Sequence, residues 1–319
     1  MTSVSIIIPY HSENEYVIGR VLSSINNQIG IDFSNVEVQL INDGGKETDP
    51  VQKFSLFNNL DIHYHSTNGV GPGMARQYGI EQSKSDYLMF MDADDEFHNV
   101  GSLLAFFNVV KGSGDHQIII SKFLEQIKNK EGEDRFLTHT NHDWNSVYAK
   151  WFNRKYIEDI GLKFHPELRI FEDTYFVNLA ASVSEDIYYS DAITYAWLYN
   201  DKSLVRSGTK SYKRQIDLWA KQTRYSLEFL KRHKPQKVKP RLISYLTETY
   251  FWAKYRTPLN WDDYLKEHRK LLNEFKDVEI SDNELEDKLK SKIEDKNSVW
   301  FQKNTDDFKK YLQNRGDLR

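Results

Sequence analysis

Four carboxylates, Asp92, Asp94, Asp95 and Glu96, follow directly after the unbroken apolar run Tyr87–Met91. Like charges and loss of hydration both raise the pKa of a carboxyl group, so such a cluster after a buried strand requires a positive partner. In an extended backbone the side chains of Asp92 and Asp94 leave the same face. Oxygen ligands at this spacing suit Mg²⁺ or Mn²⁺, which also bind phosphate oxygens and water. The alternative explanation is a solvated turn that caps the following helix.

The elements that must position these carboxylates alternate between strand and helix up to about residue 120. Apolar runs rich in β-branched residues predict strands over 4–8, 36–41, 62–65, 87–91 and 117–120. We expect Pro9 to end the first strand, because proline has no backbone N–H for the ladder. Helical spacing of apolar residues predicts helices over 13–27, 52–57, 72–81 and 100–110. This alternation is typical of a parallel, doubly wound α/β sheet.

Three polar stretches, 9–15, 42–46 and 92–96, each follow a predicted strand. Ligands of doubly wound sheets bind beyond the carboxyl ends of the strands. We therefore expect the three stretches to face one crevice. This position favours the metal-binding explanation of Asp92 and Asp94 over the solvated turn.

The pattern loosens after residue 120, and the rest of the chain divides into two parts. Residues 125–143 are polar, and we expect a surface hairpin or loop at KNKEGED, 128–134. We expect helices over 148–156 and 172–182 and a strand over 188–199. Helical spacing then predicts five helices, over 212–232, 240–256, 262–275, 283–296 and 298–313. We infer an α/β catalytic domain over 1–210, with halves 1–120 and 121–210, followed by a helical module over 211–319.

The composition excludes several classes of protein. The 319 residues carry a net charge of −4 at pH 7, which gives no general attraction to nucleic acid or anionic membranes. The chain has no cysteine, which excludes disulfides and thiolate metal sites and is compatible with a reducing compartment. The N-terminus lacks the basic and apolar regions of a signal peptide, and no stretch approaches the ~20 apolar residues of a membrane span. We therefore expect a cytoplasmic protein.

Four segments of the chain resemble, in order, the motifs of family 2 glycosyltransferases of bacterial or phage type. They are IIIPYHSENEY at 6–16, INDGGKETD at 41–49, NGVGPGMARQYGI at 68–80 and MDADD at 91–95. The resemblance extends over roughly residues 3–205. It implies an inverting enzyme with a GT-A fold, a Rossmann-like nucleotide-sugar-binding sheet that is mostly parallel and flanked by helices. The implied donor is a nucleotide diphosphate sugar, usually a UDP-sugar.

The resemblance also implies which residues contact the donor. The implied nucleotide-sugar ligands lie just after strands or near a helix start: Pro9, Tyr10, His11, Glu13, Asp43, Asn68, Arg76 and Asp92. Asp43 would accept a hydrogen bond from the base, and Arg76 suits a phosphate because its fork binds two oxygens. Asp94, with Asp92 beside it, would bind Mn²⁺ or Mg²⁺. Ordinary explanations exist for these residues too, such as a turn for Asp43 and a helix cap for Glu13.

An inverting transfer needs a general base for the acceptor hydroxyl, and the resemblance implies that Asp173 is this base. Glu172 beside it would orient the base or contact the acceptor. The ordinary explanation is that both carboxylates complement the dipole of the helix that they open. The segment before this pair, 142–164, is similar to one that faces the sugar or acceptor in relatives. It supplies Trp144 and Lys150 as acceptor contacts, and core packing is the alternative for both.

The chain departs from the family pattern beyond the predicted base. Many metal-dependent relatives have a histidine there that completes the metal site, but none lies between His165 and His233. The segment 199–212 contains Lys202, Arg206 and Lys210 instead. We expect Arg206 to contact the phosphates in place of a third metal ligand.

The C-terminal module has an uneven charge, with many basic residues and interleaved aromatic residues between 202 and 256. A solvated basic face over an aromatic core is the ordinary explanation. The alternative is a surface for a polyanionic acceptor, such as a teichoic acid or hydroxymethylated DNA. A neutral polysaccharide acceptor and homo-oligomerisation through these helices are further alternatives. A nucleotidyltransferase and an inactive nucleotide- or polymer-binding domain are the competing functions.

Overall fold

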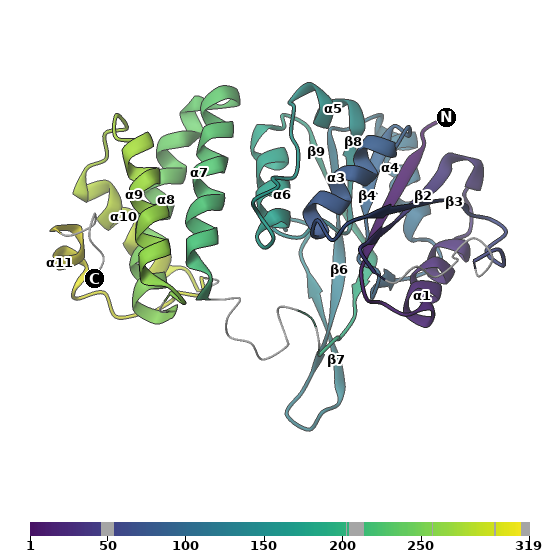
Figure 1. Cartoon of the computed structure of the whole chain (residues 1–319), viewed down its shortest axis with the longest axis horizontal. Helices are drawn as coiled ribbons and strands as arrows, with labels where there is room; N and C mark the ends of the chain where they lie inside the picture. Colours follow the sequence, from purple (N-terminus) through teal and green to yellow (C-terminus); the bar gives the residue numbers. More distant parts are fainter. Residues whose placement is uncertain (46–53, 202, 204–213, 257, 297, 314–319) are drawn as a thin grey trace. The chain divides into compact units, whose positions relative to one another are not determined.

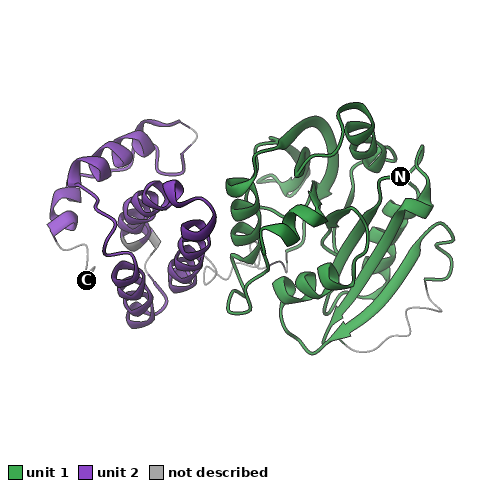
Figure 2. Ribbon diagram, turned by 90° about the horizontal axis from the view of Figure 1, so that it is seen from above, with its two compact units in different colours: residues 1–201 green, residues 202–319 purple. Residues whose placement is uncertain are grey.

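The computed structural model describes residues 1–45, 54–201, 203, 214–256, 258–296 and 298–313. These residues form two compact units, Met1–Asp201 and Lys202–Arg319, which Figure 2 shows in different colours. The first unit contains a β-sheet with helices, and the described residues of the second are mainly helical. The predicted α/β fold with C-terminal helices is thereby confirmed.

The first unit is built on one nine-stranded sheet with the order β3-β2-β1-β4-β8-β6-β9-β5, and β7 pairs with β6 (Figure 1). The strands are β1 (Val4–Tyr10), β2 (Val36–Asp43), β3 (Asp61–Thr67), β4 (Tyr87–Phe90), β5 (Glu96–Phe97), β6 (Ile118–Lys128), β7 (Asp134–His139), β8 (Lys150–Asn153) and β9 (Ile187–Trp197). Strands β3, β2, β1 and β4 are parallel, as predicted. The later strands add antiparallel pairs, β4–β8, β6–β8, β6–β7 and β5–β9.

Helices cover both faces of this sheet because alternate strand residues are apolar on each face. The helices are α1 (Glu15–Asn26), α3 (Pro72–Gln82), α4 (Ser102–Ser113), α5 (Arg154–Asp159) and α6 (Glu172–Val183). Ile6 and Ile8 of β1 share one core cluster with residues of α1 and α4. Ile7 points to the other face, where a Cβ on Gly79 of α3 would lie only 2.5 Å from its Cγ2 atom. The absence of a side chain at Gly79 therefore lets α3 pack closely on the sheet.

Pro9 does not end the first strand, contrary to the prediction, since β1 continues to Tyr10. The N–H of Met91 donates to the carbonyl of Ile7, so Ile7 faces β4. Pro9, two residues on, faces the same side. On that side β4 has already ended at Phe90. An N–H at position 9 would therefore have no partner in the ladder, and proline is tolerated there.

Two helices predicted in the first unit differ from the structure. Residues 148–156 do not form one helix, because Lys150–Asn153 is a strand between β4 and β6. Trp151 and Phe152 are both fully buried, one on each face of the sheet. A strand buried on both faces is a continuous apolar run without the alternation that distinguishes a strand from a helix in the sequence. The predicted helix 52–57 lies partly outside the described residues, and its described part is a turn in which the N–H of Phe57 donates to the carbonyl of Phe54.

The second unit contains α7 (Ile216–His233), α8 (Val238–Arg256), α9 (Trp261–Glu274), α10 (Asp282–Glu294) and α11 (Phe308–Gln313). Its core is aromatic: the Trp219 ring lies 4.8 Å from that of Trp252 and 4.7 Å from that of Tyr245. The last predicted helix is shorter than expected, since α11 begins only at Phe308. Within the described part of the chain, no helix has both the length and the apolar character needed to cross a bilayer.

Candidate active site

The segment after β4 is attached to β9 by Asp95 and Tyr195. Asp95 is 1% exposed; its Oδ2 accepts the Tyr195 hydroxyl at 2.7 Å and its Oδ1 accepts the N–H of Leu198 at 2.8 Å. The Tyr195 oxygen in turn accepts the N–H of Asp92 at 3.1 Å. Burial, and then the charges of Asp92 and Asp94, raise the pKa of Asp95. Asp95 therefore shapes the turn, while Asp92 and Asp94 remain partly exposed beside it.

Asp94 is held from two sides by residues that the motif analysis did not select. Its Oδ2 accepts the Asn200 side-chain amide at 2.7 Å, and its carbonyl accepts a hydrogen bond from Arg20 of α1. Burial raises the pKa of Asp94, the Asn200 bond opposes this shift, and the charge of Asp92 adds to it. The contacts of Arg20, Tyr195 and Asn200 with residues 92–94 depend on the packing of segments that are distant in the sequence. Asn200 alone had a sequence signal, because it lies in the segment 199–212, where the resemblance leads one to expect a histidine nearby.

Arg76 of α3 joins the end of β4 to the start of α6. Its Nη2 donates to Asp92 Oδ1 at 2.6 Å, and its Nη1 donates to Asp173 Oδ1 at 2.7 Å and to Glu172 Oε1 at 3.2 Å. The Arg76 side chain is only 4% exposed. The structure thus brings together four residues that the sequence analysis had placed in two separate groups, donor-binding and catalytic.

The predicted base, Asp173, has a carboxyl group with an altered pKa. Burial raises the pKa of Asp173, the neighbouring Arg76 guanidinium lowers it, and the charges of Glu172 and Asp92 raise it again. One guanidinium faces three carboxylates, so the negative charge is incompletely neutralised and the net shift is upward. Burial likewise raises the pKa of Glu172. A carboxyl group shifted upward is a better proton acceptor near neutral pH than an ordinary one.

The loops after β1 and β2 are held together by side chains predicted to contact the nucleotide. Asp43 Oδ1 accepts the N–H of Val70 and Oδ2 accepts the N–H of Gly71, both at 2.7 Å. The His11 Nδ1 atom donates to the Asp43 carbonyl at 2.5 Å, which requires the tautomer protonated at Nδ1. Glu13 Oε2 accepts the N–H of His11 at 2.8 Å. Asp43 therefore acts as a cap for the loop that leads to α3, and its nucleotide contact stays a prediction.

The remaining predicted residues differ in their exposure. Tyr10 is 6% exposed, Asn68 is exposed, and Arg206 lies outside the described residues. Lys150 is fully buried, with Nζ donating to Asp143 Oδ2 at 3.1 Å, and burial lowers its pKa while Asp143 raises it. Trp144 is half-buried, and its carbonyl accepts the Asn178 side chain of α6. Contact of Lys150 with an acceptor would require its buried pair to open.

The residues predicted to bind a metal ion provide suitable negative charge but few ligands. Over the described residues, no group of three or more His, Asp or Glu side chains is arranged to hold a metal ion. Asp92 and Asp94 nevertheless lie beside an excess of carboxylates over positive groups. This arrangement suits an ion such as Mg²⁺, which takes few protein ligands and completes its shell with phosphate oxygens and water.

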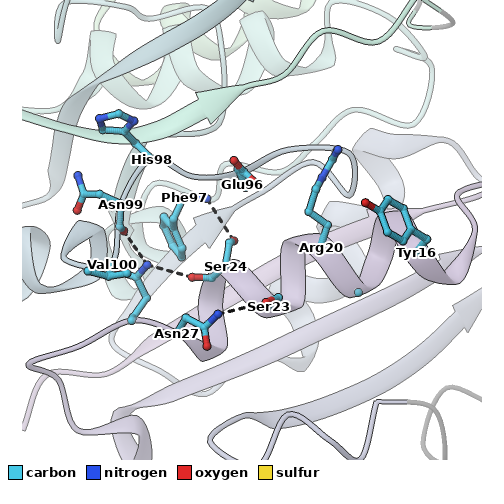
Figure 3. Close-up of a pocket in the computed structure, with 12 residues that line it drawn as sticks. Tyr16, Arg20, Ser23, Ser24, Asn27, Glu96, Phe97, His98, Asn99 and Val100 are labelled. Carbon is cyan, nitrogen blue, oxygen red and sulfur yellow. Dashed lines mark hydrogen bonds between the residues drawn. The ribbon is translucent and has the colours of Figure 1, made fainter.

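An open groove of about 580 Å³ lies beside this site, between α1 and residues 96–100 (Figure 3). Tyr16 and Arg20 of α1 and Asn27 just after it line one side, and Glu96 and His98 line the other. The groove touches the candidate active site through Arg20, which also donates to the carbonyl of Asp94. Asp92, Asp94 and the Glu172–Asp173 pair do not line it.

This fold and these strand-end carboxylates define a class: glycosyltransferases with a GT-A fold. Residues 5–161 match the family model described as "Glycosyl transferase family 2". Residues 5–161 thus form a family 2 glycosyltransferase domain. The assignment favours a glycosyltransferase over the competing nucleotidyltransferase.

Curated relatives agree with this family. The chain is 28% identical over 194 residues to the minor teichoic acid biosynthesis protein GgaB of Bacillus subtilis, across 56% of this chain and 21% of GgaB. It is 30% identical over 127 residues to the amylovoran biosynthesis glycosyltransferase AmsB of Erwinia amylovora, across 37% of this chain and 40% of AmsB. The match thus covers less than half of each relative.

The similarity in fold extends further along the chain than the similarity in sequence. A crystal structure of Staphylococcus aureus TarS in complex with UDP-GlcNAc is similar with a TM-score of 0.70 and 16% sequence identity. The superposition covers 92% of this chain and 85% of the TarS chain. At this identity the likeness confirms the GT-A fold.

Proposed function

We propose that this protein is an inverting glycosyltransferase that moves a sugar from a UDP-sugar to a hydroxyl group of a polymeric, polyanionic acceptor. The observation that carries the proposal is the Arg76 contact, which holds donor-side Asp92 and the predicted base Asp173 in one cluster. A transferase of this kind needs a diphosphate site and a general base on opposite sides of one reacting carbon. The two acidic motifs supply these two functions.

In the proposed reaction, the ionised carboxylate of Asp173 takes the proton of the acceptor hydroxyl. The acceptor oxygen attacks the anomeric carbon, and the bond from this carbon to the diphosphate oxygen breaks. The electron pair of that bond leaves with the nucleotide diphosphate, and attack from the opposite side inverts the anomeric configuration. Glu172, which shares the Arg76 nitrogen with Asp173, orients the base.

The donor assignment is supported by relatives and by the position of several predicted residues at the ends of β1 and β2. The similar TarS structures contain UDP-GlcNAc or UDP. In this chain, Pro9, Tyr10, His11, Glu13, Asp43 and Asn68 would line the base and ribose site, with Arg206 on the phosphates. Asp92 and Asp94 would hold Mn²⁺ or Mg²⁺, which when bound neutralises charge on the leaving diphosphate. The similar mannosyltransferase from Pyrobaculum calidifontis was solved with GDP-Man and Mn²⁺.

The acceptor assignment rests on relatives and on part of the basic stretch. GgaB is named for teichoic acid biosynthesis, and TarS is named as a poly(ribitol-phosphate) β-N-acetylglucosaminyltransferase. Lys231, Arg232 and Lys237, at the end of α7 and in the turn before α8, are exposed. These three define the corner that we assign to a phosphate-rich acceptor, with hydroxymethylated DNA as the second candidate.

A donor screen tests the reaction. The purified protein is incubated with Mn²⁺ or Mg²⁺ and a panel of UDP-, GDP- and dTDP-sugars, and released nucleotide diphosphate is measured. We expect slow hydrolysis of a UDP-sugar that is lost on addition of EDTA and in Asp94→Ala. Neither hydrolysis nor binding of any nucleotide sugar would contradict the proposal. Binding without turnover in the presence of every acceptor would favour the inactive binding domain.

An acceptor test uses charge reversal at the corner. The triple variant Lys231→Glu, Arg232→Glu, Lys237→Glu should lose transfer to poly(ribitol phosphate) at low salt while donor hydrolysis is unchanged. A matched triple variant at other exposed lysines of the second unit, Lys276→Glu, Lys290→Glu, Lys309→Glu, should retain transfer. Equal loss in both variants would exclude the corner as the acceptor site. Transfer to hydroxymethylated DNA alone would replace the teichoic acid assignment.

A further inference from the structure

Arg76 was expected to bind base or phosphate, but its contacts are with carboxylates. Both terminal nitrogens of the guanidinium are engaged, Nη2 with Asp92 and Nη1 with Asp173 and Glu172. Its Nε is buried and has no hydrogen-bond partner in the described structure. To bind a diphosphate, Arg76 would have to release the carboxylates and leave them buried with no positive partner. Breaking such a buried pair is strongly unfavourable.

The backbone around Arg76 is adapted to the same contact. Gly73 lies one helical turn before Arg76 on α3 and faces α6. A Cβ on Gly73 would lie 2.9 Å from Cγ and 3.1 Å from Cβ of Glu172. The close approach of α3 and α6 therefore depends on the missing side chain, and it places Glu172 and Asp173 within reach of Arg76.

The start of α6 is also conformationally restrained. Phe171, just before Glu172, has φ 63° and ψ 10°, the left-handed conformation that is unfavourable for residues other than glycine. Strained residues of this kind persist only where the surrounding structure holds them, and they concentrate at functional sites. The turn at Phe171 directs both carboxylates of the first turn of α6 toward α3.

We propose that Arg76 is a positioning residue for the base: it fixes the Asp173 carboxylate relative to donor-side Asp92 and does not bind the phosphates. The planar guanidinium sets distance and direction at both ends, which a single ammonium group cannot do. The acceptor proton is then removed at a defined distance from the carbon of the bound sugar. This inference rests on the proposed function in taking Asp173 as the base.

The first test separates positioning from donor binding. In Arg76→Gln, we expect transfer kcat to fall by about 100-fold or more, because small misplacements of a reacting group have effects of that size. The dissociation constant for UDP, measured by calorimetry, should change by less than about threefold, because Arg76 makes no contact with the donor in this proposal. Arg76→Lys should not restore kcat. The control Arg135→Gln removes an exposed arginine that pairs with Glu133 and should leave both quantities unchanged.

Two results would overturn the inference. If Arg76→Gln weakens UDP binding by more than tenfold with little effect on kcat, Arg76 is a donor ligand, as the resemblance implied. If Arg76→Lys has normal kcat, the positive charge alone is sufficient and the planar contact has no positioning role.

A second test does not depend on turnover. Melting temperatures are measured for Arg76→Gln, Asp173→Asn and the double variant. Because the two side chains contact each other, we expect the double variant to lose less than the sum of the two single losses. Additive losses would overturn the inference, since they would show that the two side chains do not interact. Coupling in a protein that binds and turns over no nucleotide sugar would refute the proposed function and reduce Arg76 to a structural contact.

Discussion

At the scale of single residues, the site is governed by the shortage of positive charge around its carboxylates. Asp92, Glu172 and Asp173 share one buried guanidinium, and Asp94 lies close to Asp92. Burial raises the pKa values of Asp94, Glu172 and Asp173, and the charge of Asp92 adds to each shift. The pKa of Asp173 lies well above the ordinary aspartate value of about 3.9 for this reason.

The pH dependence of transfer should reflect this shift. Asp173 must be ionised to accept the proton, so kcat/KM should fall as the pH falls through its raised pKa, well above pH 3.9. Asp173→Asn, which has no basic carboxylate, should lose at least about 100-fold in kcat at all pH values. The measurement is a pH–rate profile with UDP binding as the control. A variant with more than a tenth of the wild-type rate would exclude Asp173 as the base.

Gly73 gives a second prediction at this scale. In Gly73→Ala the new Cβ would displace Glu172, so we expect at least about tenfold loss of kcat, although alanine favours the helix by about 1 kcal/mol. Gly112→Ala in α4 is the matched control, because a Cβ there meets no atom within 4 Å. It should raise the melting temperature and leave kcat unchanged. Equal activity of the two variants would contradict the close approach of α3 and α6.

At the scale of elements, the ends of the parallel strands form the frame of the site. β1, β2 and β4 end side by side. Asp43 at the end of β2 binds the segment after β3, and Asp95 after β4 binds the segment after β9. These carboxylates accept backbone N–H groups that the ended strands no longer pair. Carboxylates conspicuous in the motifs thus also shape the loops at the strand ends.

Asp43→Ala tests this role of a strand-end carboxylate. The N–H groups of Val70 and Gly71 would lose their acceptor, so the free energy of unfolding should fall by about 1–3 kcal/mol. The control is Asp61→Ala, at the exposed start of β3, where we expect a change within about 0.5 kcal/mol. Urea unfolding at pH 7 measures both. Equal destabilisation by the two variants would show that Asp43 does not cap the loop.

At the scale of the whole molecule, the chain combines a sheet-based unit that carries the site with a helical unit that has an aromatic core. The net charge of −4 does not describe how charge is distributed within these units. The first unit gathers buried carboxylates around one arginine, whereas the second exposes a basic corner at Lys231, Arg232 and Lys237. Local charge, and not the total, determines what each unit attracts.

Metal addition tests the consequence for the whole protein. Because the site carries excess negative charge, Mn²⁺ together with UDP should raise the melting temperature by more than the sum of their separate effects. Asp94→Asn should abolish this cooperative increase and leave most of the effect of UDP alone. Thermal unfolding with and without EDTA measures it. A cooperative increase that persists in Asp94→Asn would show that the ion binds elsewhere.

Local patterns in the sequence determined the strands, most helices and the polar strand ends of this protein. Strand and helix periods are properties of neighbouring residues, so β1, β2 and α6 could be predicted from spacing. The start of α3 could be predicted from Pro72. The order of the motifs was sufficient to place the chain among family 2 glycosyltransferases, which the family model confirmed.

The tertiary structure decided what local patterns do not contain. The strand β8 was mistaken for helix because burial on both faces removes the period, and Pro9 is tolerated because its neighbouring strand has ended. The role of Arg76 depends on contacts with residues 16, 96 and 97 positions away in the chain. Only the order of strands in the sheet and the packing of α3 against α6 set those contacts. A carboxylate motif indicates a type of chemistry, but the tertiary structure determines which positive side chain lies beside it.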